Sequence, residues 1–230
     1  MRAAPLFPPI DDPSAIVGVS LMYKLISRPG WGSIMTEVQL DWYGLDYTIE
    51  DVDDLFKSTE ARESVQRLNP LAQLPTLILP SGAVMTESAA FTLYLADVTR
   101  SNELVPAPDE PLRPAFLRWL VFIVANIYPT FTYADDPSRF VPGEEAQKGF
   151  RENVDAYARR LWGIVEGEAG QPWFLGDRLS ALDLYISAMT RWRPKREWFA
   201  ANAPRLYAIG TAFEALPQVQ SVWNRNFPAA

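Results

Sequence analysis

The sequence contains neither cysteine nor histidine. Their absence excludes disulfide bonds, zinc sites made of thiolates or imidazoles, a cysteine nucleophile and a serine–histidine–aspartate triad. It also fits a reducing compartment, because structural disulfides belong to oxidising ones, and we expect a cytoplasmic protein. Nucleophilic chemistry would therefore have to use hydroxyls, carboxylates, Lys or Arg, or a thiol borrowed from a bound molecule.

Positive charge and long apolar runs are also scarce. Lys and Arg total 21 against 28 for Asp and Glu, which gives a formal net charge of −7. This balance argues against nucleic-acid binding, which needs a basic face. No apolar run approaches the ~20 residues that span a bilayer, so we expect no membrane partner. Asp51, Asp53 and Asp54 lie too close together to predict a metal site.

The first half of the chain alternates between strand-like and helical segments. Residues 1–18 are proline-rich, lack the apolar segment of a secretory signal, and are interpreted as an N-terminal tail. A strand, a helix and a second strand follow, and such a unit crosses over right-handed with its strands parallel. The order of elements predicts a thioredoxin-like domain over residues 19–100. Its expected elements are strands at 19–27 and 46–53, helices at 33–44, 57–68 and 87–98, and a hairpin around Pro80-Ser81-Gly82.

The second half of the chain shows helical periodicity only. Residues 101–111 hold three prolines and no periodicity, which is typical of a linker. Apolar stripes predict long helices at 112–134, where Pro129 should introduce a kink or an end, and at 144–168. Ser180 and Asp183 form a capping box at the start of a further helix. An all-helical domain is therefore predicted over residues 112–230.

The segment before the third predicted helix carries the clearest functional signal. Leu74-Pro75 opens an apolar strand, and Glu87-Ser88 begins the helix after the hairpin. At this spacing, and ahead of an all-helical second half, the two pairs resemble the glutathione-binding segment of serine-type cytosolic glutathione S-transferases. The resemblance covers nearly the whole chain after about residue 19.

The resemblance implies a binding mode for glutathione, the co-substrate of that family. A cis bond into Pro75 would leave the backbone of Leu74 free to pair with the tripeptide, as in strand addition. Glu87 would bind the γ-glutamyl ammonium and Ser88 its carboxylate at the helix N-terminus. Gln73 would reach the glycyl carboxylate, with Trp31 also in contact. The resemblance further implies a homodimer and a hydrophobic electrophile that enters between the two domains.

Ser33 is the predicted catalytic residue. A free thiol with a pKa of ~8.5 is mostly protonated at neutral pH, and lowering that pKa by ~2 units requires about 2.7 kcal/mol of thiolate stabilisation. Serine-type members place a hydroxyl where the first helix begins, and Ser33 follows Gly30-Trp31-Gly32 at that junction. The alternative is that Ser33 only caps the helix. Cysteine-type members place their thiol at or near Gly32, which has no side chain.

Several interpretations stay open at the level of sequence. The aromatic residues Tyr128, Phe131 and Tyr133 fit either an acceptor pocket or the core. The basic run from Arg191 to Arg196 fits a solvated face or a set of carboxylate partners. Alternatives to conjugation are another glutathione-dependent enzyme (an isomerase, lyase or peroxidase) and a non-catalytic binding module with the same fold.

Overall fold

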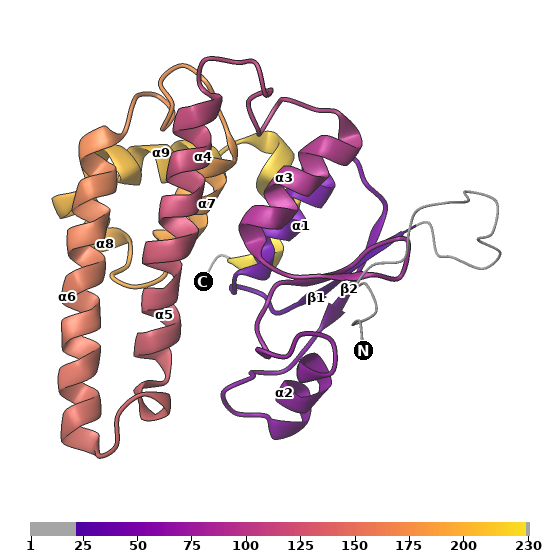
Figure 1. Ribbon diagram of the computed structural model, residues 1–230. Helices are drawn as coiled ribbons and strands as arrows, with labels where there is room; N and C mark the ends of the chain where they lie inside the picture. Colours follow the sequence, from indigo (N-terminus) through magenta and orange to yellow (C-terminus); the bar gives the residue numbers. More distant parts are fainter. Residues whose placement is uncertain (1–21, 229–230) are drawn as a thin grey trace, which may run out of the picture.

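The computed structural model describes residues 22–228, which form two packed halves (Figure 1). The predicted tail and residues 19–21 of the first predicted strand lie outside the described residues. The first half is a sheet covered by helices and the second half is helical, which confirms the predicted fold class. The elements of the first half are β1 (Tyr23–Ser27), α1 (Ser33–Trp42), β2 (Tyr47–Asp51), α2 (Thr59–Gln66), β3 (Thr76–Ile78), β4 (Val84–Met85) and α3 (Ser88–Thr99).

The four strands lie in the order β2-β1-β3-β4. β1 runs parallel to β2, as the predicted crossover requires, and antiparallel to β3. Neighbouring residues of β1 point to opposite faces of the sheet because side chains alternate along a strand. Leu25 packs with Phe91 of α3, whereas Ile26 packs with Val65 of α2. Helices therefore cover both faces of the sheet.

The second half begins with a helical stretch that continues through Pro129. The chain widens into a π-helical segment, Ile123–Ile127, immediately before the first turn of α5, which contains this proline. The proline lacks an N–H donor, and a local widening is one way a helix accommodates that. The elements here are α4 (Arg113–Phe122), α5 (Tyr128–Asp135), α6 (Glu144–Glu168), α7 (Ala181–Met189), α8 (Arg196–Asn202), α9 (Pro204–Glu214) and α10 (Gln220–Asn226), with 3₁₀ turns at Pro137–Arg139 and Pro217–Val219.

The continuous stretch Arg113–Asp135 is long and apolar enough, by length and composition, to cross a membrane, and among residues 22–228 it alone is. A core helix of a globular protein meets the same criterion. Phe116, Leu120, Ile123 and Ile127 are fully buried in the main core cluster together with residues of α6 and α7. One face of this stretch therefore packs into the core between the two halves.

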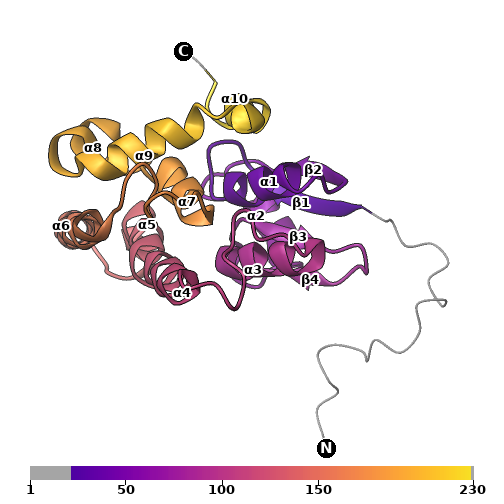
Figure 2. The ribbon, with the colours of Figure 1, turned by 90° about the horizontal axis from the view of Figure 1, so that it is seen from above.

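α1 belongs to the cores of both halves. Every residue from Ser33 to Leu40 is buried. Leu40 packs in the core of the sheet, whereas Ile34 and Met35 pack with the second-half helices. Seen from above, α1 lies between the sheet and α10 (Figure 2). Because α1 packs into both cores, it fixes the position of the two halves relative to each other.

Two further contacts position the second half. In the predicted linker, Leu104 is fully buried, and its carbonyl accepts a hydrogen bond from the backbone N–H of Ala181 at 2.7 Å. The predicted capping box is present at the start of α7: the N–H of Leu182 donates to Ser180 Oγ at 3.3 Å, and the N–H of Ser180 donates to Asp183 Oδ2 at 2.8 Å. Burial raises the pKa of Asp183 to about 7, and the backbone N–H groups of Phe174 and Ser180 act in the opposite direction.

Candidate functional site

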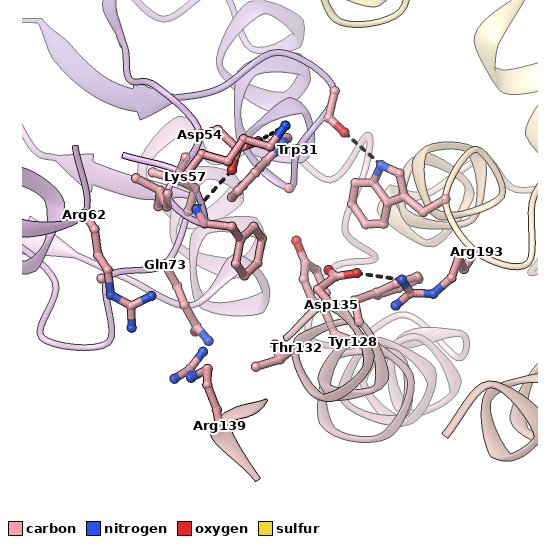
Figure 3. A pocket seen from close by; sticks show the side chains of 18 residues that line it. Trp31, Asp54, Lys57, Arg62, Gln73, Tyr128, Thr132, Asp135, Arg139 and Arg193 are labelled. Carbon is pink, nitrogen blue, oxygen red and sulfur yellow. Dashed lines mark hydrogen bonds and ion pairs between the residues drawn. The ribbon is translucent and has the colours of Figure 1, made fainter. Parts of the chain in front are cut away.

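A cavity of about 500 Å³ opens between the two halves. Ligand sites of 300–1,000 Å³ at domain interfaces are common in proteins. The walls of this cavity come from the loop after β1, the segment around α2, the loop before β3, α5 with the following turn, and the loop after α7 (Figure 3). The lining residues are Gly30, Trp31, Gly32, Asp54, Leu55, Phe56, Lys57, Arg62, Ala72, Gln73, Leu74, Tyr128, Phe131, Thr132, Asp135, Arg139, Trp192 and Arg193.

The loop before β3 carries three of the predicted site residues, Gln73, Leu74 and Pro75. Gln73 and Leu74 line the cavity, the Leu74–Pro75 peptide bond is cis, and Pro75 is buried behind them. The side chain of Asn69 holds this loop by donating to the carbonyl of Gln73 at 3.0 Å. Within residues 22–228 neither the N–H nor the C=O of Leu74 takes part in a hydrogen bond. An extended peptide in the cavity would satisfy both groups.

Ser33 does not line the cavity, which differs from the sequence-based expectation. Its side chain is fully buried, and Oγ accepts hydrogen bonds from the Ser27 hydroxyl at 3.0 Å and the Arg28 N–H at 3.2 Å. The same hydroxyl donates to the carbonyl of Arg28 at 3.1 Å. The alternative reading as an N-cap is also wrong, because Gly32 is the N-cap and Ser33 is the first helical residue. Through these hydrogen bonds the Ser33 hydroxyl stabilises the loop after β1.

Glu87 and Ser88 begin α3 as predicted, but they stand beside the cavity and not on its wall. Glu87 has a positive φ of 72°, a conformation that is uncommon for a residue with a side chain and that clusters at ligand sites. The half-buried Ser88 lies near the hydroxyl of Tyr185 on α7, whose pKa it lowers against the stronger opposite effect of burial. Glu87 is near enough to Tyr128 to contribute to the raised pKa of that phenol. Both residues therefore lie close to tyrosines of the second half.

Aromatic side chains form the opposite wall. Of the three aromatic residues left open above, Tyr128 and Phe131 line the cavity, whereas Tyr133 is 41% exposed and packs on Phe140. Trp192, which the sequence did not single out, contacts both lining rings, with centroid separations of 6.0 Å to Tyr128 and 5.2 Å to Phe131. Trp31 stands on the other side, 5.4 Å from Phe56.

Charged groups are unevenly paired around the rim. Arg193 forms ion pairs with Asp135 at 2.7 Å and Asp155 at 3.2 Å. Arg62 and Arg139, by contrast, form no ion pair with any residue between 22 and 228, and they flank the amide of Gln73 at one end of the cavity (Figure 3). That end therefore suits a carboxylate. In the described part of the chain no cluster of acidic side chains has the arrangement needed to hold a metal ion.

The three arginines of the basic run that follows α7 are accounted for by carboxylate partners. Arg191 and Arg196 each donate to Glu214 Oε2 at 2.6 Å. Together with the two partners of Arg193, these pairs favour the second of the two interpretations considered for this run. They also fix the loop that carries Trp192, whose Nε1 donates to the carbonyl of Gly30 at 2.8 Å.

Comparisons with known proteins agree on one family. A family model described as "Glutathione S-transferase, N-terminal domain" matches residues 33–98. The "Uncharacterized GST-like protein YncG" of Escherichia coli (strain K12) is 38% identical over 206 residues, which cover 89% of this chain and 98% of the relative. Glutathione S-transferase GstA of Escherichia coli O157:H7 is 28% identical over 172 residues, covering 74% of this chain and 81% of that protein.

Solved structures give the same result. A glutathione transferase from Methylococcus capsulatus superposes with a TM-score of 0.70 at 31% identity, covering 87% of this chain and 97% of the other. A transferase homologue from Sulfitobacter with bound glutathione superposes with a TM-score of 0.76, covering 89% and 98% of the two chains. At 18% identity that second likeness bears on the fold alone.

Proposed function

The chain belongs to the cytosolic glutathione S-transferase superfamily, and from that premise we propose that it is a transferase that conjugates the glutathione thiolate to a hydrophobic electrophile. The observation that carries the proposal is the free backbone of Leu74 at the wall of the cavity. An extended tripeptide would pair with its N–H and C=O, as a strand pairs with a sheet edge. We further propose a cytoplasmic homodimer.

The charged ends of glutathione have complementary groups on both sides of Leu74. The carboxylate of Glu87 would bind the γ-glutamyl ammonium, and the Ser88 hydroxyl, at the N-terminus of α3, would bind the adjoining carboxylate. At the far end, Gln73 with Arg62 and Arg139 would bind the glycyl carboxylate (Figure 3). This binding mode would put the cysteinyl sulfur between Trp31 and the aromatic wall of the second half.

The acceptor would be apolar or aromatic. Trp31, Phe56, Tyr128, Phe131 and Trp192 all line the cavity, and burial of apolar surface against such rings is worth about 25 cal/mol per Å². Edge-to-face contacts with an aromatic acceptor add about 0.5–1.5 kcal/mol per ring pair. Since these rings come from both halves, the electrophile would enter along the boundary between the halves.

Retention on immobilised glutathione, together with turnover of a chloronitrobenzene, tests this function. We expect Ser88→Ala to weaken glutathione binding about 10- to 100-fold, because a hydrogen bond to a charged group is worth about 1.5–3 kcal/mol. Isothermal titration calorimetry measures the change. Ser81→Ala is the matched control, since Ser81 lies exposed in the turn between β3 and β4 and does not line the cavity.

Three results are informative. Binding with turnover supports the transferase. Binding without turnover of any electrophile tested would favour the non-catalytic module or another glutathione-dependent enzyme, and assays for isomerase, lyase and peroxidase activity separate those. A wild-type protein that is not retained on glutathione and shows no turnover would contradict the proposal.

A further inference from the structure

Building on the transferase function proposed above, we propose that Tyr128 is the catalytic residue that donates a hydrogen bond to the glutathione thiolate. The hydroxyl that the sequence predicts at the start of α1 would then come from the other half of the molecule.

The hydroxyl of Tyr128 occupies the space in which a side chain at position 32 would lie. A Cβ placed on Gly32 would be 1.8 Å from Tyr128 Oη and 3.3 Å from the carbonyl oxygen of Leu74. Oη therefore lies beside the backbone with which glutathione is proposed to pair. Gly32 is also the N-cap of α1, where free backbone N–H groups present the positive end of the helix dipole. A thiolate at this point would meet an O–H donor and a helix N-terminus together.

The ring of Tyr128 is held in this position from several sides. Tyr128 is the first residue of α5 and directly follows the π-helical segment, and such segments are frequent at functional sites. Phe131 and Trp192 pack edge-on against it, with ring centroids 6.2 Å and 6.0 Å away. Trp192 in turn donates to the carbonyl of Gly30, so the same aromatic group is tied to the loop that carries Gly32. Such bracing is what a preorganised donor requires.

The Tyr128 hydroxyl has its proton free to donate. No acceptor for it is found among residues 22–228, whereas the Ser33 hydroxyl already donates to Arg28 and is fully buried. Tyr128 is half-buried and lines the cavity. Burial, followed by the neighbouring Tyr185 and Glu87, raises the pKa of Tyr128 above its ordinary value. The phenol therefore stays protonated at neutral pH and acts as a donor, not as a base.

The reaction balances without a basic residue. The glutathione thiol loses its proton to water, and the resulting thiolate is held by the Tyr128 hydroxyl, which keeps its own proton. With a chloronitrobenzene, the sulfur lone pair forms the C–S bond and the C–Cl bond breaks, so that chloride leaves with the bonding pair. The chain contains no cysteine, so a mixed disulfide between glutathione and the protein is excluded.

The test measures the pKa of the enzyme-bound glutathione thiol from the ultraviolet absorbance of the thiolate as pH is varied. We expect Tyr128→Phe, which removes one oxygen, to raise this pKa by about 1–2 units, and kcat/KM at neutral pH to fall about 10- to 100-fold, since each unit is a tenfold change. The dissociation constant for glutathione in its protonated thiol form, measured below the thiol pKa, should stay within about twofold. Gly32→Ala keeps the phenol but displaces it with the added methyl, so the thiol pKa should move in the same direction.

Two matched variants decide between the hydroxyls. Tyr133→Phe changes an exposed tyrosine on the same helix, away from the cavity, and should leave the thiol pKa unchanged. Ser33→Ala should affect stability more than the thiol pKa. If Ser33→Ala raises the thiol pKa while Tyr128→Phe does not, the assignment to Tyr128 is overturned and the transferase stands. If the wild-type protein shows no bound thiolate at all, the proposed function itself fails.

Discussion

Asp183→Ala is expected to lower the free energy of unfolding by about 3–5 kcal/mol. Asp183 is fully buried at the third position of α7. Its Oδ1 accepts from the N–H of Phe174 at 2.7 Å and its Oδ2 from the N–H of Ser180 at 2.8 Å. The substitution would leave both N–H groups buried without acceptors, at about 1–3 kcal/mol each. Urea denaturation followed by circular dichroism measures the loss.

Two further variants make the Asp183 result interpretable. Asp183→Asn keeps one acceptor oxygen but turns an NH₂ group toward the other donor, so its loss should be intermediate. Asp177→Ala removes an exposed aspartate from the preceding loop and should change the free energy of unfolding by less than about 0.5 kcal/mol. A loss for Asp183→Ala no larger than that of the Asp177 variant would contradict the structural role assigned to the capping box.

The capping box was predictable because a helix start is a local event. Ser180 and Asp183 lie within one helical turn, and a hydroxyl and a carboxylate at this spacing predict which backbone N–H groups they accept hydrogen bonds from. The order of strands and helices was predictable for a similar reason, since hydrophobic periodicity reports which side of each element is buried. The free backbone of Leu74 was expected from the family resemblance, which rests on residues that are adjacent in the chain.

The position of the hydroxyl that we propose to face the sulfur was not predictable from such signals. Ser33 is at the expected junction, but its side chain turns toward Ser27 and Arg28, and this direction depends on the path of the loop between them. Tyr128 meets Gly32 only because the second half folds back onto α1. A glycine at the cysteine-type position was visible in the sequence. What fills the space beside it depends on tertiary packing, which periodicity does not report.

The contact of Trp192 with Gly30 also depends on tertiary packing, and so do the walls of the cavity as a whole. The sequence does not single out this indole, because a tryptophan within a basic run fits many loops equally well. In the structure, the ion pairs of Arg191, Arg193 and Arg196 fix that loop, and the indole then reaches the first half. The walls of the site are thus set by charges and rings far apart in sequence, whereas the segment that would bind the tripeptide backbone is local.

A second large loss of stability is expected for Arg225→Ala, which we place at about 2–4 kcal/mol at neutral pH. Glu37 of α1 is 1% exposed, and its Oε2 accepts from Arg225 Nη1 at 2.7 Å and from Asn226 Nδ2 at 2.9 Å. The amide oxygen of Asn226 also accepts from the N–H of Gly30 at 3.2 Å, so α10 holds both α1 and the loop at the cavity. Removal of Arg225 would leave a buried carboxylate without its ionic partner.

The loss from Arg225→Ala should depend on pH, and the sign follows from Glu37. Burial raises the pKa of Glu37 above its ordinary value, while Asn226 and Arg225 oppose that rise. A group whose pKa is raised on folding contributes stability that is present below its unfolded pKa and is lost as pH rises through its folded pKa. Without Arg225 the folded pKa moves higher still, so the cost of the substitution should be greater at pH 8 than at pH 5.

Unfolding midpoints of wild type, Arg225→Ala, Glu37→Gln and the double variant across this pH range test the assignment. In the Glu37→Gln background the cost of removing Arg225 should lose its pH dependence, because the amide does not titrate. Lys24→Ala is the matched control: its ion pair with Glu50 is about half exposed, so its removal should cost less than about 1 kcal/mol at every pH. If the loss from Arg225→Ala were constant across the range, or persisted unchanged with glutamine at position 37, a buried charge at Glu37 would not be its cause.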